Sequence, residues 1–317
     1  MIDRQSPRPL NIVELLVASA RLYRNNLLTF VLITALVLVP YNLLIFMLAD
    51  ATTPLTMGRV INNLVLGTSR PDGVNGWPGL IYILIAQPIM HGTLILAAAQ
   101  CYRQQPLSIA TNAQAARGRI GSLLGVAIQK GLFLFAALLL SFVLRFLVNG
   151  LLLEFLPNEW FFPLTPFSQI SRLVFGGLSL LLPLYVYARL IVATQAVLLE
   201  DRVAADGIAR SRQLTKNSDW RVAAFIVVVL LLQLGLPTLI IGAATSGVAA
   251  LSLDAQLVST LQMALLTIAQ IVAWPFSFIA YTLLFFDLRI RNDGFDPEHD
   301  PLTLGLRDGE HPAWLSA

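Results

Sequence analysis

The sequence has few charged residues, few histidines and a single cysteine, and each shortage excludes a class of site. Only 12% of the 317 residues are charged, which is about half the share in a soluble globular domain, roughly 25%. Cys101 has no partner for an internal disulfide. The three histidines, His91, His299 and His311, are too scattered along the chain for the close ligand spacing of a metal site. The sequence therefore predicts no metal, no other cofactor and no catalytic residue.

Long apolar runs dominate the chain instead. Hydrophobic residues make up 56% of it, and runs of about 18 or more apolar residues with few charges are typical of membrane-spanning helices. The runs are continuous and do not alternate with a period of two, which disfavours strands. The sequence thus predicts an all-α, polytopic membrane protein with a single membrane domain, residues 1–290, and a polar cytoplasmic tail, residues 291–317. The six predicted spans are about 27–49, 80–99, 123–150, 174–199, 222–250 and 257–286.

Lysines and arginines gather on one side of the predicted membrane. Fifteen of the 21 lie in the segments on the N-terminal side, and three lie in the segments on the other side. Basic residues are retained on the cytoplasmic side of membrane proteins, so both termini are predicted to be cytoplasmic. Because these residues are dispersed among span ends, nucleic-acid binding is not indicated. Membrane lipids are the expected partners, since basic residues attract anionic head groups, and other membrane subunits are possible partners.

An amphipathic segment precedes the first predicted span. In residues 9–25 the apolar side recurs with a helical period, which predicts a helix lying in the membrane interface with that side toward lipid. Similar basic segments precede the third and fifth spans, at 101–121 and 200–221. The mostly apolar stripe of the first segment consists of Ile12, Leu15, Leu16, Ser19, Leu22 and Tyr23.

Three features recur at nearly one period, which predicts a triplicated unit of an amphipathic helix and a two-span hairpin. Each segment before an odd-numbered span carries an arginine, at intervals of 96 and 95 residues: Arg21, Arg117 and Arg212. Each even-numbered span carries a proline expected to kink the helix, at intervals of 95 and 92 residues: Pro88, Pro183 and Pro275. A polar residue follows each of these prolines by twelve positions: Gln100, Gln195 and Asp287. A threefold bundle would bring the kinks together.

Arg189 is the most informative charged residue within a predicted span. It lies about ten residues, or about 15 Å, from the cytoplasmic end, where a charge usually faces the bundle interior or water. One interpretation is that it binds a lipid phosphate or a substrate anion. The other is that it pairs with backbone carbonyls or with Asp287, which equivalent hairpins would place about 9 Å nearer the cytoplasm. Gln100 and Gln195 complete the set of candidate ligand residues.

Two more cations lie within the third predicted span. Lys130 and Arg145 are each within reach of an interface. We expect both to extend their charged ends to the interface along the apolar stem.

Three stretches of the sequence resemble a bacterial membrane family. They are PLNIVELLVASARLYRNNLLTF, VLLEDRVAADGIARSRQLTKNSDWRV and LLFFDLRIRNDGFDPE. Over most of residues 9–297 the chain resembles the membrane domain of glycerophosphoryl diester phosphodiesterase and related six-span proteins of unassigned role. This resemblance implies six spans in the bacterial cytoplasmic membrane. In the fused enzymes the chemistry lies in a separate soluble domain, for which this chain has no matching stretch, so no enzymatic activity is expected.

Three classes of function stay open. The preferred one is a non-enzymatic membrane protein that handles lipids or supports envelope homeostasis, because of the basic amphipathic segments, Arg189 and the family resemblance. A transporter or channel subunit would use the kinked repeat, but the spans carry no acidic residue apart from Asp287 at an inner end. The third class is a membrane anchor or structural subunit of a larger complex.

Overall fold

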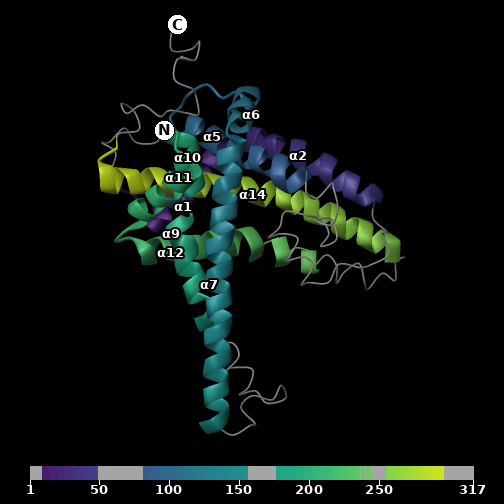
Figure 1. Cartoon of the computed structure of the whole chain (residues 1–317). Coiled ribbons are helices and arrows are strands. Elements are labelled where there is room, and N and C mark those ends of the chain that lie inside the picture. Colours follow the sequence, from purple (N-terminus) through teal and green to yellow (C-terminus); the bar gives the residue numbers. More distant parts are fainter. Residues whose placement is uncertain are drawn as a thin grey trace.

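The computed structural model describes residues 9–48, 81–155, 176–235, 237–239, 241–243 and 255–295 (Figure 1). Every regular element in these ranges is helical, and six segments are long and apolar enough to cross a membrane. The prediction of an all-α chain with six such spans is confirmed. The predicted span residues at 49, 80, 174–175, 236, 240 and 244–250, and the predicted tail beyond residue 295, lie outside the described residues. The six segments are Leu27–Leu44, Tyr82–Tyr102, Ile120–Val148, Gly176–Leu199, Asp219–Ala243 and Thr260–Asp293.

Several spans are divided by breaks in the helix. The fourth span changes helix at residues 191–192, and π-helical turns interrupt the second and fifth. By contrast, the sixth span is one helix that contains Pro275 and continues to Asp293. The elements are α1 (Ile12–Asn25), α2 (Leu27–Leu48), η2 (Tyr82–Ala86), α5 (Gln87–Tyr102), α6 (Ile109–Gly118), α7 (Ile120–Phe155), α9 (Leu181–Leu190), α10 (Ala193–Leu199), α11 (Ala204–Thr215), α12 (Asp219–Leu230), η4 (Leu231–Gly235) and α14 (Ala255–Asp293).

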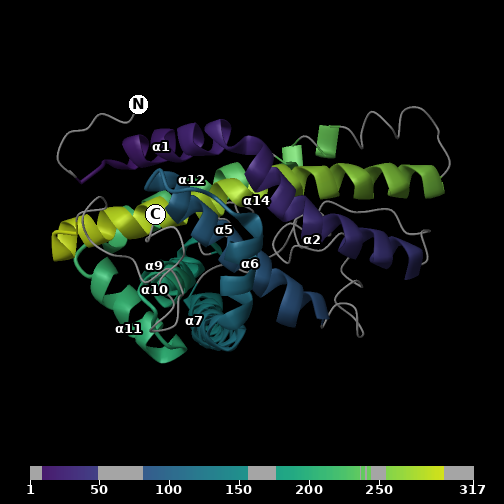
Figure 2. The same cartoon turned by 90° about the horizontal axis from the view of Figure 1, so that it is seen from above.

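Helix α1 begins with a reciprocal cap and packs along the last span. The Asn11 side chain accepts a hydrogen bond from the Glu14 backbone N–H, and the Glu14 carboxylate accepts one from the Asn11 N–H, each at 2.8 Å. This capping box satisfies two N–H groups that have no partner within the helix. Figure 2 shows α1 lying beside α14.

The apolar stripe of α1 does not face lipid as predicted. Leu15, Ser19 and Leu22 are buried, and α1 contacts α14 most extensively. Ser19 fits among apolar neighbours because its hydroxyl donates to the Leu15 carbonyl at 2.7 Å. The side of α1 that faces away from the protein carries Val13 and Arg24, both exposed. The stripe thus attaches α1 to the bundle.

The spans form two groups that run in different directions. Helices α2 and α5 pack against α14, whereas α7 packs against α9. The α7–α9 pair runs crosswise to α2 and α14, as Figures 1 and 2 show from two sides. The core includes residues 94–99 of α5 and 283–286 of α14, which are almost completely buried.

Helix α7 exposes most of its apolar side chains. Exposed fractions reach 66% at Leu132 and 68% at Phe142. An apolar surface of this length is stable in lipid and unfavourable in water. The composition and the exposure of α7 therefore agree in indicating a lipid-facing span.

We expect Phe135→Lys to impair membrane insertion of α7, because Phe135 is 64% exposed near the middle of the span Ile120–Val148. A lysine at the centre of a span costs about 2.5–3.5 kcal/mol on insertion scales. The matched control is Val13→Lys, since Val13 is 66% exposed but lies on α1, outside the spans. Membrane fractionation and thermal unfolding in detergent measure the effect. Equal tolerance of both substitutions would show that α7 does not lie in the bilayer.

Candidate functional site

The three stretches that carry the family resemblance meet at one end of the molecule. Leu10 comes from the first, Arg221 from the second, and Asp287 from the third. Helices α1, α11 and α12 all contact α14, and its final turns lie among them in Figure 1. Segments separated by up to 281 residues are joined there by hydrogen bonds.

Asp287 is the centre of this junction. Its side chain is 2% exposed and accepts from the Leu10 backbone N–H at 2.7 Å. It also pairs with Arg221 at 2.8 Å and with Arg291 at 2.9 Å. The same two guanidinium groups donate to the Leu10 carbonyl, at 2.6 and 2.7 Å. One carboxylate and two arginines therefore bind both polar groups of Leu10, which holds the start of α1 against α12 and α14.

Glu200 forms a second centre at the same end. Its side chain is 8% exposed and accepts hydrogen bonds from Arg202 at 2.7 Å and from Arg210 at 2.9 Å. It also forms an ion pair with Arg289 at 3.2 Å. Arg210 also binds Asp293 in the last turn of α14, so α11 and α14 are joined directly. Burial lowers the pKa of Arg210, but hydrogen bonds and charge interactions with Glu200 and Asp293 outweigh this effect and raise its pKa overall. Its guanidinium group therefore stays charged.

Arg189 has a different partner from the one predicted. Its Nη1 atom lies 3.0 Å from Asp219 Oδ1, and its guanidinium carbon lies 5.9 Å from the centre of the Tyr185 ring. Asp287 is engaged by Arg221 and Arg291 instead. The estimate of a 9 Å separation assumed a continuous helix, whereas the fourth span leaves α-helical geometry immediately after α9. Helix α9 packs against α12, which places Arg189 beside the first residue of α12.

The two candidate glutamines have unlike surroundings. Gln100 Oε1 accepts from Asn112 Nδ2 at 2.8 Å, which links α5 to α6. Gln195 is 2% exposed, and its Oε1 atom has no hydrogen-bond partner. The residue twelve positions after Gln195 is Gly207, where an added Cβ would lie 2.5 Å from Val197 Cγ2. Close backbone packing of α10 on α11 thus replaces the amide pair of α5 and α6.

All three repeated prolines are buried, although their helices differ. Pro88 lies in the first turn of α5, directly after the π-helical turn η2. Pro183 lies near the start of the short helix α9, and Pro275 lies within the long helix α14. The structure thus places each proline within its predicted span and away from the surface.

The acidic partners at this end were not identified from the sequence as site residues. Glu200, Asp219 and Asp293 all lie within or next to the quoted motifs, and their charges were the available signal. Among the described residues, no three histidine, cysteine or acidic side chains are grouped so that they could hold a metal ion. Comparison with protein-family models, curated proteins and solved structures finds no match to this chain.

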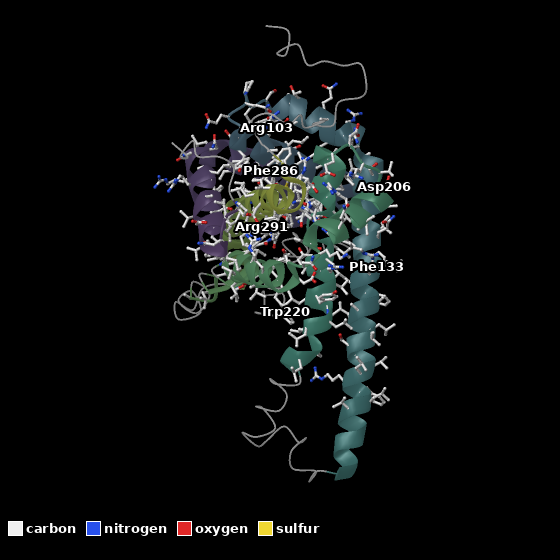
Figure 3. The ribbon with its side chains drawn as sticks, turned by 90° about the vertical axis from the view of Figure 1, so that its left-hand side faces the viewer. Arg103, Phe133, Asp206, Trp220, Phe286 and Arg291 are labelled. Carbon is white, nitrogen blue, oxygen red and sulfur yellow. The ribbon has the colours of Figure 1, made fainter. Side chains whose placement is uncertain are left out.

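Replacing Asp287 by Asn should destabilise the fold by about 3–5 kcal/mol, because two guanidinium groups lose their buried counter-charge. Asp206→Asn is the matched control, since Asp206 is an exposed acid on α11 and should change stability by no more than about 0.5 kcal/mol. In the view of Figure 3, Arg291 lies near the middle of the molecule and Asp206 at its edge. Equal unfolding temperatures of the two variants in detergent would contradict a structural role for Asp287.

A charge exchange tests the partner of Arg189. Arg189→Glu should destabilise the protein by about 1 kcal/mol or more through repulsion of Asp219, and a second change, Asp219→Arg, should restore most of the loss. The matched control pairs Arg189→Glu with Asp206→Arg, at an exposed position on α11, which should not restore stability. Equal unfolding temperatures of the two double variants would contradict the Arg189–Asp219 pair.

Proposed function

We propose that this chain is a non-enzymatic integral membrane protein that handles lipids, binding anionic head groups at its cytoplasmic side. One observation carries the proposal. The repeated arginines Arg21, Arg117 and Arg212 are all exposed, and none has an acidic side chain within 4 Å among the described residues. In contrast, the buried carboxylates of Glu200 and Asp287 are each shared by at least two arginines. Three basic groups therefore stay available for an external anion.

The positions of these arginines favour lipid as that anion. Each lies on a helix, α1, α6 or α11, that closely precedes a span. Trp220, at the start of α12, is 79% exposed. Exposed tryptophan and arginine near the ends of spans are typical of the head-group region. A bacterial cytoplasmic membrane with both termini inside remains the proposed location.

A threefold arrangement of the same unit would explain the repetition. The end of each even-numbered span packs on one amphipathic helix, as α5 on α6, α10 on α11 and α14 on α1. In each of these amphipathic helices, the residues four and eight positions after the N-cap are buried. These residues are Leu15 and Ser19, Asn112 and Ala116, and Gly207 and Ser211. In two of the proposed units the chain runs directly from the span into the amphipathic helix, from α5 to α6 and from α10 to α11. In the third, α14 with α1, the contact between Leu10 and Asp287 takes the place of that connection.

Removing the three arginines should release bound anionic lipid. At about 1 kcal/mol for each basic residue near an anionic surface, Arg→Gln at positions 21, 117 and 212 should weaken binding on the order of a hundredfold. The matched control is Arg→Lys at the same positions, which keeps the charges. Mass spectrometry of the lipids that co-purify, at low and at high salt, measures the difference. Unchanged anionic lipid in the glutamine variant would reject the proposal.

A further inference from the structure

Four helices bring polar and aromatic side chains together between the two groups of spans. His91 of α5 lies against α14, with its ring centre 4.4 Å from that of Phe278 and 5.5 Å from that of Trp274. Lys130 of α7 lies with its Nζ atom 5.9 Å from the centre of the Tyr187 ring on α9. Helix α5, which carries His91, packs against α7, which carries Lys130. The cluster is completed by Tyr281 of α14, whose hydroxyl lies next to that of Tyr187.

Several hydrogen-bonding groups of this cluster are unsatisfied. Trp274 is 3% exposed, and its Nε1 atom, which can only donate, has no hydrogen-bond partner. His91 Nε2 is likewise buried without a partner. Tyr281 is 7% exposed, and its contact with Tyr187 is too loose for a well-aligned hydrogen bond. Buried polar atoms are rarely left in this state, so the cluster has the capacity to bind another molecule.

The cluster also carries a charge that the protein does not compensate. Lys130 lies ten residues after the start of α7, or about 15 Å along the helix. Within the described part of the chain, no carboxylate pairs with it. Asp219 and Asp287, at the ends of other spans, are bound to arginines. Lys130 therefore needs an anion from outside the protein, since an isolated ammonium group is unfavourable in a membrane.

We propose that His91, Lys130, Trp274 and the Tyr187–Tyr281 pair form a binding site for one phosphate-bearing anion. A phosphate group offers several acceptor oxygens that can be reached from different directions, and the donors of this cluster come from four helices. The same chemistry is found in free phosphate and in a phospholipid head group. Phe133, three residues after Lys130 on the same side of α7, is 39% exposed, which gives acyl chains an apolar surface beside the site.

This site is separate from the surface arginines of the proposed function. Arg21, Arg117 and Arg212 are exposed, so salt should displace lipid bound there. The ligand at Lys130 is expected to resist salt better, because two of its donors, Trp274 and Tyr281, are buried between helices. Either proposal can thus fail without the other.

Thermal unfolding of the full-length protein, delipidated in a neutral detergent, tests the site. The probes are inorganic phosphate and short-chain phosphatidylglycerol, compared for wild type, Lys130→Met, Trp274→Phe and Arg145→Met. Arg145 is the matched control, because it is the other cation within α7 and lies fifteen residues, or about 22 Å, further along the helix. Lys130→Met removes an uncompensated charge, so we expect it to fold, and Trp274→Phe retains most of the ring volume.

We expect phosphatidylglycerol to raise the unfolding temperature of wild type and of Arg145→Met, including in high salt. Lys130→Met should bind it about tenfold more weakly or worse, which is the expected effect of losing a charged donor, and Trp274→Phe should show a smaller loss. A comparable response of wild type to inorganic phosphate would identify free phosphate as the ligand. The proposal is overturned if neither probe stabilises wild type, or if Lys130→Met and Arg145→Met respond equally.

Discussion

The carboxylate of Asp287 is the interaction on which the arrangement of this end of the protein depends. It lies at 2% exposure near the end of the last span and binds the backbone N–H of Leu10, two residues before α1, together with two arginines. A buried carboxylate with one partner gains little net stability, because desolvation offsets the attraction. Here three donors surround it, and the arginines also satisfy the Leu10 carbonyl. Helices α1, α12 and α14 are consequently fixed relative to one another by one group.

Charged residues are distributed in two ways that follow from this constraint. Where the helices meet, acids and arginines neutralise each other around Asp287 and Glu200. On the outer sides of the amphipathic helices, and beside His91 within the spans, cations have no acidic partner among the described residues. We propose that lipid supplies the missing negative charge at the outer positions and a phosphate-bearing anion at Lys130. The paired charges would then determine the fold, and the unpaired ones the function.

The sequence predicted the spans well because a long apolar run has few alternatives to crossing a membrane. Its predictions for single side chains were weaker. For Arg189 the sequence allows an anion, backbone carbonyls or Asp287 as the partner, whereas the structure pairs it with Asp219, beyond the break that follows α9. The α1 stripe was assigned to lipid, yet periodicity cannot distinguish a lipid-facing side from one packed on another helix. Lys130 lies over Tyr187 because α9 packs beside α7, a contact that the sequence does not predict.

The central claim is that the contact of α14 with α1 is equivalent to the two contacts that the chain itself connects, α5 with α6 and α10 with α11. A circular permutant tests this claim most directly, with a flexible linker from Phe295 to Pro9 and new termini in the α5–α6 connection at 103–107. Its thermal unfolding in detergent is the measurement. A ring of three equivalent units predicts cooperative unfolding within a few degrees of the wild-type temperature. Failure of the permutant to fold, while a wild-type chain with an equally long linker inserted at 103–107 folds normally, would contradict it.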